Sequence, residues 1–198
     1  MTIPKWADAN EETRRYYNNE WGRLPENDDA AFEMLSLLTF QAGLTWATVL
    51  SKREALRAAF SDFKVETVAK MKDEDVARLL QGDSPIKNER KIRAVIQNAK
   101  AIQEYRSTVQ HEKRKNAFLA VLENSAGKPG VWPVYGEEQM TLLRHFFNDW
   151  GFTFTGPKLI RALVESFDLA LPWLQEEPTI GSVLNTMQVV VDPVNNHV

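Results

Sequence analysis

Aromatic residues near the beginning of the sequence are the first candidates for ligand binding. They are Trp6, Tyr16, Tyr17, Trp21 and Trp46. Aromatic side chains at helical spacing usually pack in a hydrophobic core, so the residue type alone does not define a site. Two details favour a ligand, because Tyr16 lies in a polar segment and Trp46 follows Gly43, where the backbone can come close to another molecule. Such an arrangement suits a flat ligand, for example a nucleobase held between ring faces.

A second group of residues could contact phosphate. Residues 74–103 are predicted to form two helices joined by a short turn, and basic side chains follow that turn at Lys87, Arg90, Lys91 and Arg93. In a helix-hairpin-helix module, such a turn presents backbone N–H groups and a helix N-terminus to phosphate. Helix hairpins are common, however, and this turn lacks Gly-x-Gly. A run of charges is also typical of an ordinary solvated helix face.

Composition limits the other kinds of site. The chain has 198 residues, 43% of them hydrophobic and 26% charged, which suffices for one good core or two small lobes. It has no cysteine and three scattered histidines (His111, His145 and His197), so we expect no disulfide, metal site or cofactor. No stretch is apolar enough to span a membrane, and the N-terminus lacks a signal-peptide pattern, so a cytoplasmic protein is expected. Because the formal net charge is -3, any nucleic-acid surface must be local.

Helical spacing of apolar residues dominates the chain. The clearest case is the stripe between Ile92 and Tyr105, which predicts a long amphipathic helix. Helix starts are indicated by Asn27, by Asp73 and by Pro157, the last of which suits the first turn of a helix. Several further helices are therefore predicted.

Strands should be minor or absent. The best alternating run is the short tail at residues 187–194, and turn residues predict interruptions at 81–88 and 124–136. We therefore predict an all-α fold of about eight helices in one or two packed lobes.

Longer blocks of sequence match a known family in their order and spacing. The blocks are YYNNEWG at 16–22, FQAGLTWATVLSKRE at 40–54, IKNERKI at 86–92 and GFTFTG at 151–156. They resemble the 3-methyladenine DNA glycosylase I family over about residues 6–170. The resemblance implies a helix-hairpin-helix DNA glycosylase-like fold in one helical domain of residues 1–198. Its hairpin lobe should cover about residues 60–125, with the N- and C-terminal segments forming the other lobe.

The resemblance also implies a function and a set of site residues. The family flips a methylated adenine out of duplex DNA and cleaves its N-glycosidic bond, which is a step of base-excision repair. The residues that match its base pocket are Trp6, Tyr16, Trp21, Leu38 and Trp46. The residues expected at the DNA are Gly43, Leu44, Ser84, Lys87, Arg90 and Lys91, of which the first two match the element that fills the gap left by the base. The implied partner is duplex DNA containing a damaged base, bound by a monomer.

The base pocket departs from the family pattern. The family's pocket glutamate falls at Leu38, so hydrocarbon replaces a buried acceptor. A cationic base then loses a charge-assisted hydrogen bond worth roughly 1.5–3 kcal/mol, or about ten- to a hundredfold in affinity or rate. The preferred lesion should therefore differ, or activity should be weak.

The family's metal site is also missing. Its structural zinc is held by two cysteines and two histidines, whose positions fall at Pro4, Tyr17, Trp173 and Glu177. Since all four ligands are absent, we expect apolar packing of Tyr17 against Trp173 to replace the metal. The hairpin glycine falls at Ser84 and an arginine at Glu89, so DNA affinity should be lower than in typical members.

Three functions remain open at this point. The first is a DNA N-glycosylase that releases an alkylated purine, the second a degenerate relative that holds a modified base or another flat ligand without cleavage, and the third a structural or protein-binding role. No general base is assigned, because Glu20 and Asp28 lie near helix starts, where carboxylates usually cap helices.

Overall fold

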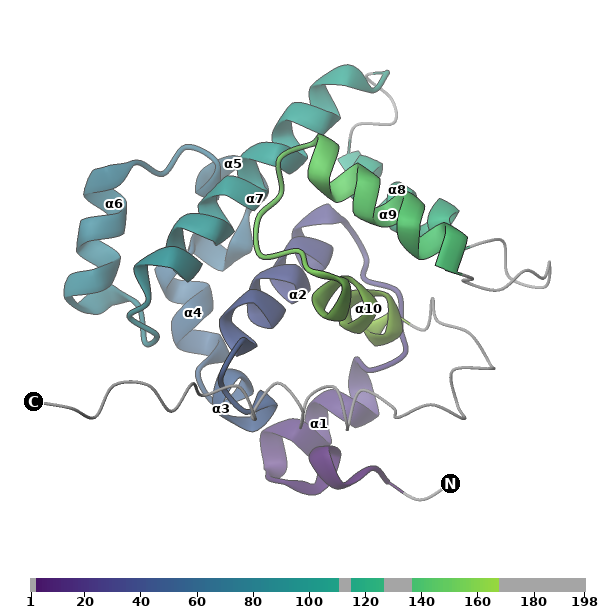
Figure 1. The fold of residues 1–198 in the computed structure, drawn as a ribbon. Coiled ribbons are helices and arrows are strands. Elements are labelled where there is room, and N and C mark those ends of the chain that lie inside the picture. Colours follow the sequence, from purple (N-terminus) through teal and green to yellow (C-terminus); the bar gives the residue numbers. More distant parts are fainter. Residues whose placement is uncertain (1–2, 111–114, 127–136, 168–198) are drawn as a thin grey trace, which may run out of the picture.

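The structure is a computed structural model that describes residues 3–110, 115–126 and 137–167 (Figure 1). Within these ranges every regular element is helical, so the predicted all-α class is confirmed. The described α-helices are α1 (Glu11–Asn19), α2 (Asp28–Gln41), α3 (Trp46–Leu50), α4 (Arg53–Ala59), α5 (Val65–Val68), α6 (Asp73–Arg78), α7 (Glu89–Thr108), α8 (Ala117–Ala126), α9 (Glu137–Asp149) and α10 (Pro157–Ser166). Short 3₁₀ turns η1 (Lys5–Asp8) and η2 (Ser61–Phe63) and the π turn η3 (Leu79–Asp83) join them.

The described segments contain more helices than the eight predicted, because some are very short. Helix α3 has five residues and α5 has four, and segments of that length carry too few apolar repeats to be recognised by period. The interruption predicted at 124–136 begins later, since α8 continues to Ala126. The rest of that interruption and the alternating tail at 187–194 lie outside the described residues.

The predicted helix starts are confirmed by local geometry. The Asn27 side chain accepts a hydrogen bond from the Ala30 N–H at 3.0 Å and so caps α2. Helix α10 begins with Pro157, whose missing N–H costs nothing at that position. Helix α6 begins at Asp73, and the Asp75 carboxylate accepts from the Lys72 N–H.

Helix α2 is the centre of the molecule. Twelve of its 14 residues are buried, and it contacts α3, α5, α7, α8, α10 and η2 (Figure 1). A helix that is buried nearly all round needs apolar side chains on most faces, which residues 30–40 supply. The buried residues form one continuous hydrophobic cluster from Trp6 to Phe167. The division into a hairpin lobe and a second lobe stays a prediction.

The predicted helix hairpin is present. Helix α6 passes into η3, the chain turns at residues 84–88, and α7 follows. Helix α7 also anchors the loop before α10, because the Asn98 amide donates to the Thr153 carbonyl at 3.1 Å and accepts from its N–H at 2.8 Å.

A buried carboxylate ties three helices together. Asp28, in the first turn of α2, is fully buried and accepts from the Arg106 guanidinium of α7 at 2.8 Å. It also accepts from the N–H groups of Phe118 and Leu119 in the first turn of α8, at 3.2 and 2.7 Å. A negative charge at a helix N-terminus is favourable, so Asp28 fixes the position of α8 against α2.

Replacing this carboxylate should destabilise the fold. We expect Asp28→Asn to lower the free energy of unfolding by about 3–5 kcal/mol, because it removes the buried charge that pairs with the Arg106 guanidinium and with the first turn of α8. Urea unfolding followed by circular dichroism measures the change. The matched control is Asp149→Asn at the exposed end of α9, which should stay within about 0.5 kcal/mol of the wild type. Equal stabilities of the two variants would show that Asp28 does not hold α8.

Candidate functional site

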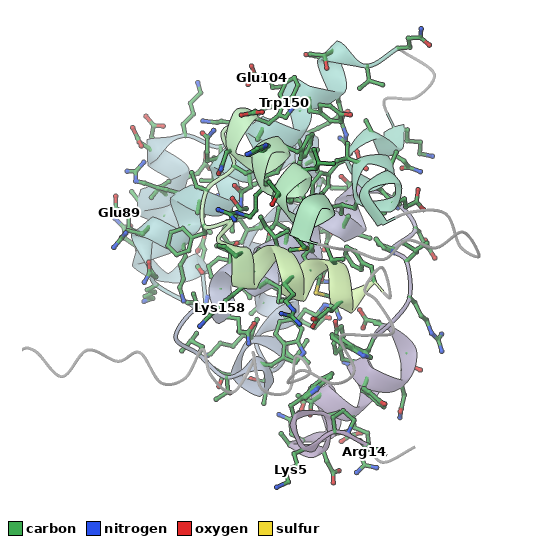
Figure 2. The ribbon with its side chains drawn as sticks, turned by 45° about the vertical axis from the view of Figure 1, so that its right-hand side comes forward. Lys5, Arg14, Glu89, Glu104, Trp150 and Lys158 are labelled. Atoms are coloured by element: carbon green, nitrogen blue, oxygen red, sulfur yellow. The ribbon has the colours of Figure 1, made fainter. Side chains whose placement is uncertain are left out.

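The tertiary structure brings the predicted pocket aromatics together. Trp6 from η1 meets the ring of Trp21 at 5.2 Å and that of Tyr16 at 6.2 Å, measured between ring centroids. Tyr16 of α1 in turn meets Trp46, the first residue of α3, at 5.3 Å. We call these four residues the aromatic cluster. It lies at the end of the molecule where Figure 1 labels α1 and α3, and Figure 2 shows Lys5 and Arg14 at this end, opposite Trp150.

Tyr16 and Trp46 form the closed part of the aromatic cluster, whereas Trp21 is only partly buried. The exposed fraction is 2% for Tyr16 and 4% for Trp46, and their ring planes meet at 70° in an edge-to-face contact. Every ring pair in the cluster is tilted or edge-on, with interplanar angles of 52–70°. Two surface hollows are described, and the residues that line them belong to α2 and α5–α7 with nearby loops rather than to the cluster. A base could therefore lie between ring faces only after a ring has moved.

Leu38 lies on the face of α2 that meets this cluster. Met34, Leu38 and Gln41 follow one another at i, i+4 and i+7, so they share one stripe of the helix. The Tyr16 hydroxyl lies 3.7 Å from the Met34 sulfur, within the reach of a weak hydrogen bond, and so locates the stripe beside the aromatic rings. Leu38 is 4% exposed and contributes only hydrocarbon.

Polar atoms in this region lack partners. The Gln41 carboxamide is fully buried, and neither its Oε1 nor its Nε2 has a hydrogen-bond partner among the described residues; the same holds for Trp46 Nε1. Each such group costs about 1–3 kcal/mol. Sequence reasoning missed Gln41, because a glutamine at a helix end is usually exposed. Its spacing of three residues from Leu38 is the signal that could have found it.

A tight turn connects α2 to α3. The Leu44 N–H donates to the Gln41 carbonyl at 2.6 Å, and the dihedral angles at Ala42 (φ -48°, ψ 113°) and Gly43 (φ 76°) are those of a type II turn. This turn requires positive φ at its third residue, which explains the glycine at position 43. Gly43 is exposed and Leu44 is half-buried, as suits a wedge beside a ligand.

Lys91 has a different role from the one predicted. It was expected to contact DNA phosphate, but it is only 7% exposed, and its ammonium donates to the carbonyls of Phe40 and Ala42. Burial lowers the pKa of Lys91. The residue therefore holds the turn at the end of α2, and the prediction of a direct phosphate contact is wrong, because the ammonium points inward.

The other predicted DNA contacts lie at the hairpin turn. Ser84 is buried, its N–H donates to the Leu79 carbonyl, and its hydroxyl donates to the Ile86 carbonyl at 2.9 Å. The turn thus satisfies these groups internally instead of leaving them for phosphate. Lys87 and Arg90 are exposed, so they stay candidates for contact with DNA.

An ion-pair network locks the carboxylates near the cluster. Glu33 of α2 accepts from Arg53 at 2.7 Å and from Arg57 at 2.7 and 3.1 Å, and Arg53 also donates to Glu20 at 2.7 Å. Burial alone would raise the pKa of Glu33, but the hydrogen bonds from Arg57 and Arg53 outweigh burial and hold that pKa below its ordinary value of 4.5. Both carboxylates are engaged in ion pairs, as is Asp28, so none of these three is positioned as a general base.

Tyr16 is suited to hydrogen bonding rather than to proton abstraction. Burial raises the pKa of its hydroxyl far above the usual range, with the charge of Glu20 adding to the effect and that of Arg53 opposing it. The hydroxyl therefore stays protonated. Together with the cluster rings, it offers shape and neutral polar contacts to a flat ligand.

The predicted replacement of the zinc site by packing of Tyr17 against Trp173 stays a prediction. Tyr17 packs edge-on against Trp6 at 5.7 Å, whereas Trp173 and Glu177 lie outside the described residues. A backbone hydrogen bond from Gly22 to Ser166, 3.0 Å long, joins the end of α1 to α10. In residues 3–110, 115–126 and 137–167, no three His, Cys, Asp or Glu side chains gather as a metal site would require. None of the helices in those ranges is long and apolar enough to cross a membrane.

The helix hairpin and the aromatic cluster, which are the two features that the resemblance to DNA glycosylases implies, are both present in the described segments. A family model described as methyladenine glycosylase matches residues 6–171, which is most of the chain, so the chain belongs to the methyladenine glycosylase family. Over 87 residues it is 51% identical to DNA-3-methyladenine glycosylase 1 of Escherichia coli (strain K12), covering 43% of this chain and 46% of that protein. Over 86 residues it is 40% identical to DNA-3-methyladenine glycosylase of Haemophilus influenzae, again covering 43% and 46%. These alignments thus span just under half the length of the curated relatives.

Solved structures agree over a longer range. A crystal structure of 3-methyladenine DNA glycosylase I has a TM-score of 0.69 and 30% identity, covering 83% of this chain and 91% of the other. The Staphylococcus aureus enzyme, in a structure that concerns 3-methyladenine recognition, has a TM-score of 0.70 and 26% identity, covering 83% and 88%. The expected glycosylase fold is therefore confirmed.

Removing the buried ammonium should destabilise the α2–α3 turn. We expect Lys91→Met to lower the free energy of unfolding by about 1–3 kcal/mol, because the carbonyls of Phe40 and Ala42 lose their donor. Urea unfolding measures the loss. Lys87→Met is the matched control on the exposed hairpin, and it should change stability by less than about 0.5 kcal/mol. If both variants were as stable as the wild type, Lys91 would not support the turn.

The Glu33 network should make stability depend on pH. Because the folded-state pKa of Glu33 is lowered, its contribution is present above pH 4.5 and is lost as the pH falls through the folded-state value. We therefore expect Glu33→Gln to flatten the acid limb of a curve of unfolding free energy against pH. Glu54→Gln removes the exposed partner of Arg57, so it should leave the curve near that of the wild type. A Glu33→Gln curve that kept the wild-type slope would contradict this role.

Proposed function

We propose that this protein is a DNA N-glycosylase of base-excision repair that flips an alkylated purine out of duplex DNA and releases it by hydrolysis. The observation that carries the proposal is the meeting of Tyr16, Trp46 and Met34, from three separate helices, with Leu38 one turn after Met34 on the same face of α2, in a chain of this family. The relatives are named for 3-methyladenine, so an N3-alkylated adenine is the proposed substrate.

The proposed reaction asks little acid or base chemistry of the protein. An adenine alkylated at N3 carries a positive charge within DNA, so it leaves as a neutral base that takes the electron pair of the broken N-glycosidic bond. Water supplies the hydroxyl at the sugar carbon and releases its proton to solvent. This agrees with the neutral Tyr16 hydroxyl and with the paired state of Glu20, Asp28 and Glu33. The protein acts by flipping, stacking and orienting the base.

DNA binding is proposed for two surfaces. The exposed turn at Gly43 and Leu44 would fill the gap left by the flipped base, and Lys87 and Arg90 would contact the backbone near the hairpin. Duplex DNA with a damaged base is then the partner of a cytoplasmic monomer. With Lys91 directed inward and Ser84 bonded within the turn, few groups of the hairpin remain for phosphate.

A second function is favoured by the closed cluster and by Leu38. A protein that binds a modified base without cleaving it needs stacking but no catalytic contact, and hydrocarbon at position 38 supplies no hydrogen bond to a flipped base. The two functions differ in whether a free base is released from DNA.

Base release from methylated duplex DNA tests the proposal. We expect slow release by the wild type, loss of at least tenfold in Trp46→Ala, since base–aromatic stacking contributes about 1–3 kcal/mol, and a rise of about tenfold or more in Leu38→Glu, which restores an acceptor. Trp150→Ala removes an indole from a separate aromatic group, where Trp150, just after α9, packs against Tyr105 of α7, and it should keep wild-type release. Single-turnover assays with chromatography of the free bases give the rates.

Two outcomes separate the functions. Trp46-dependent binding of a methylated base without release by any variant would favour the binding protein. Wild-type release that is unchanged in Trp46→Ala would contradict the stacking role.

A further inference from the structure

Gln41 is exceptional among the buried polar residues of α2. The hydroxyls of Ser36 and Thr39 donate to the carbonyls one turn earlier, at 2.8 and 2.9 Å, and the carboxylates of Asp28 and Glu33 are held by arginines. The Gln41 carboxamide is equally buried, yet neither of its polar atoms has a partner among the described residues. Buried polar groups are almost always paired, and an exception needs an explanation.

The unpaired carboxamide belongs to the candidate site. Gln41 follows Leu38 by three residues and Met34 by seven, and Tyr16 connects that stripe to Trp46 through its contacts with Met34 and with the indole. Trp46 Nε1 is itself buried and without a partner in the described ranges. Helix α2, on the stripe that meets Tyr16, and helix α3, at Trp46, thus each carry buried hydrogen-bonding atoms without a described partner.

The backbone at Gln41 is fixed, although its carboxamide has no partner in the part of the chain that the structure describes. The Gln41 carbonyl accepts from the Leu44 N–H, and Lys91 holds the carbonyls on either side, those of Phe40 and Ala42. A side chain mounted on a rigid backbone loses little freedom when a ligand binds. The fixed backbone is therefore suited to hold the Gln41 carboxamide for recognition of a ligand. The need to hold this backbone explains why Lys91 is buried next to it.

A carboxamide offers one donor and one acceptor side by side. Adenine presents the complementary pair, an amino N–H beside a ring nitrogen, whereas guanine presents two acceptors, O6 and N7, on the corresponding edge. Leu38 can contribute neither partner. We propose that Gln41 reads the flipped base through this donor–acceptor pair, so that alkylated adenines are selected over alkylated guanines. This inference rests on the proposed glycosylase function.

Replacing the Gln41 carboxamide distinguishes a role in base recognition from a role in the stability of the fold. Gln41→Met, which has a similar volume and no polar atoms, should keep or raise the melting temperature, because it removes an unpaired buried group. The ratio of methyladenine to methylguanine release should fall by about five- to 150-fold, as expected for one bidentate contact. The substrate is duplex DNA treated with dimethyl sulfate, and the ratio compares the two bases methylated at N3, 3-methyladenine and 3-methylguanine, which are separated by chromatography. Gln41→Leu gives a second apolar replacement.

Gln97→Met is the matched control. Its amide donates to the Gly151 carbonyl at 3.2 Å, so the same substitution should slightly lower the melting temperature and leave the ratio of released bases unchanged. A lower melting temperature in Gln41→Met, with release of both bases reduced equally, would show that Gln41 is structural and overturn the inference.

The proposed glycosylase function can fail independently of the proposed role of Gln41. A wild type that releases no base overturns it, and titration of tryptophan fluorescence with free 3-methyladenine and 3-methylguanine then decides the inference. Preference for the adenine that is lost in Gln41→Met supports the reading role, and equal affinities for both bases overturn it.

Discussion

The burial of α2 on nearly every side is the constraint on which the rest of the structure depends. A helix in this position can carry polar side chains only where each one finds a partner, and the neighbouring helices are arranged to supply them. Asp28 binds Arg106 and the start of α8, and Glu33 binds two arginines of α4. These contacts fix α4, α7 and α8 around α2, and among the buried polar side chains of α2 they leave the Gln41 carboxamide without a partner in the described segments.

The end of α2 is where this constraint becomes useful for recognition. Lys91 stabilises the carbonyls at the helix end, and the type II turn at Gly43 leads directly into α3 with Trp46 as its first residue. The stacking ring is therefore positioned by a short, rigid connection. Tyr16 packs against Trp46 from α1, and this edge-to-face contact keeps both rings from water; in the proposed function a flat base replaces the contact.

Departures from the family pattern fit one account of the site. Hydrocarbon at Leu38 removes a charged contact to a cationic base, while stacking by Trp46 and the neutral hydroxyl of Tyr16 remain available. A site of this kind holds a base more through ring contact and neutral hydrogen bonds than through charge. At the hairpin, Ser84 is bonded within the turn and Lys91 points inward, so Lys87 and Arg90 are the exposed residues among the DNA contacts predicted there.

The sequence alone determined the helical class, the helix starts at Asn27 and Pro157, the hairpin, and the family, because caps, apolar period and ordered blocks are local features. It also indicated the aromatic residues that meet in the site. Only the tertiary structure decided which charges are buried and what they bind. Lys91 looks like a phosphate ligand within a basic run, and Gln41 looks like a solvated helix end. Their roles depend on partners about 50 residues away or on the lack of any described partner, and no local pattern records either.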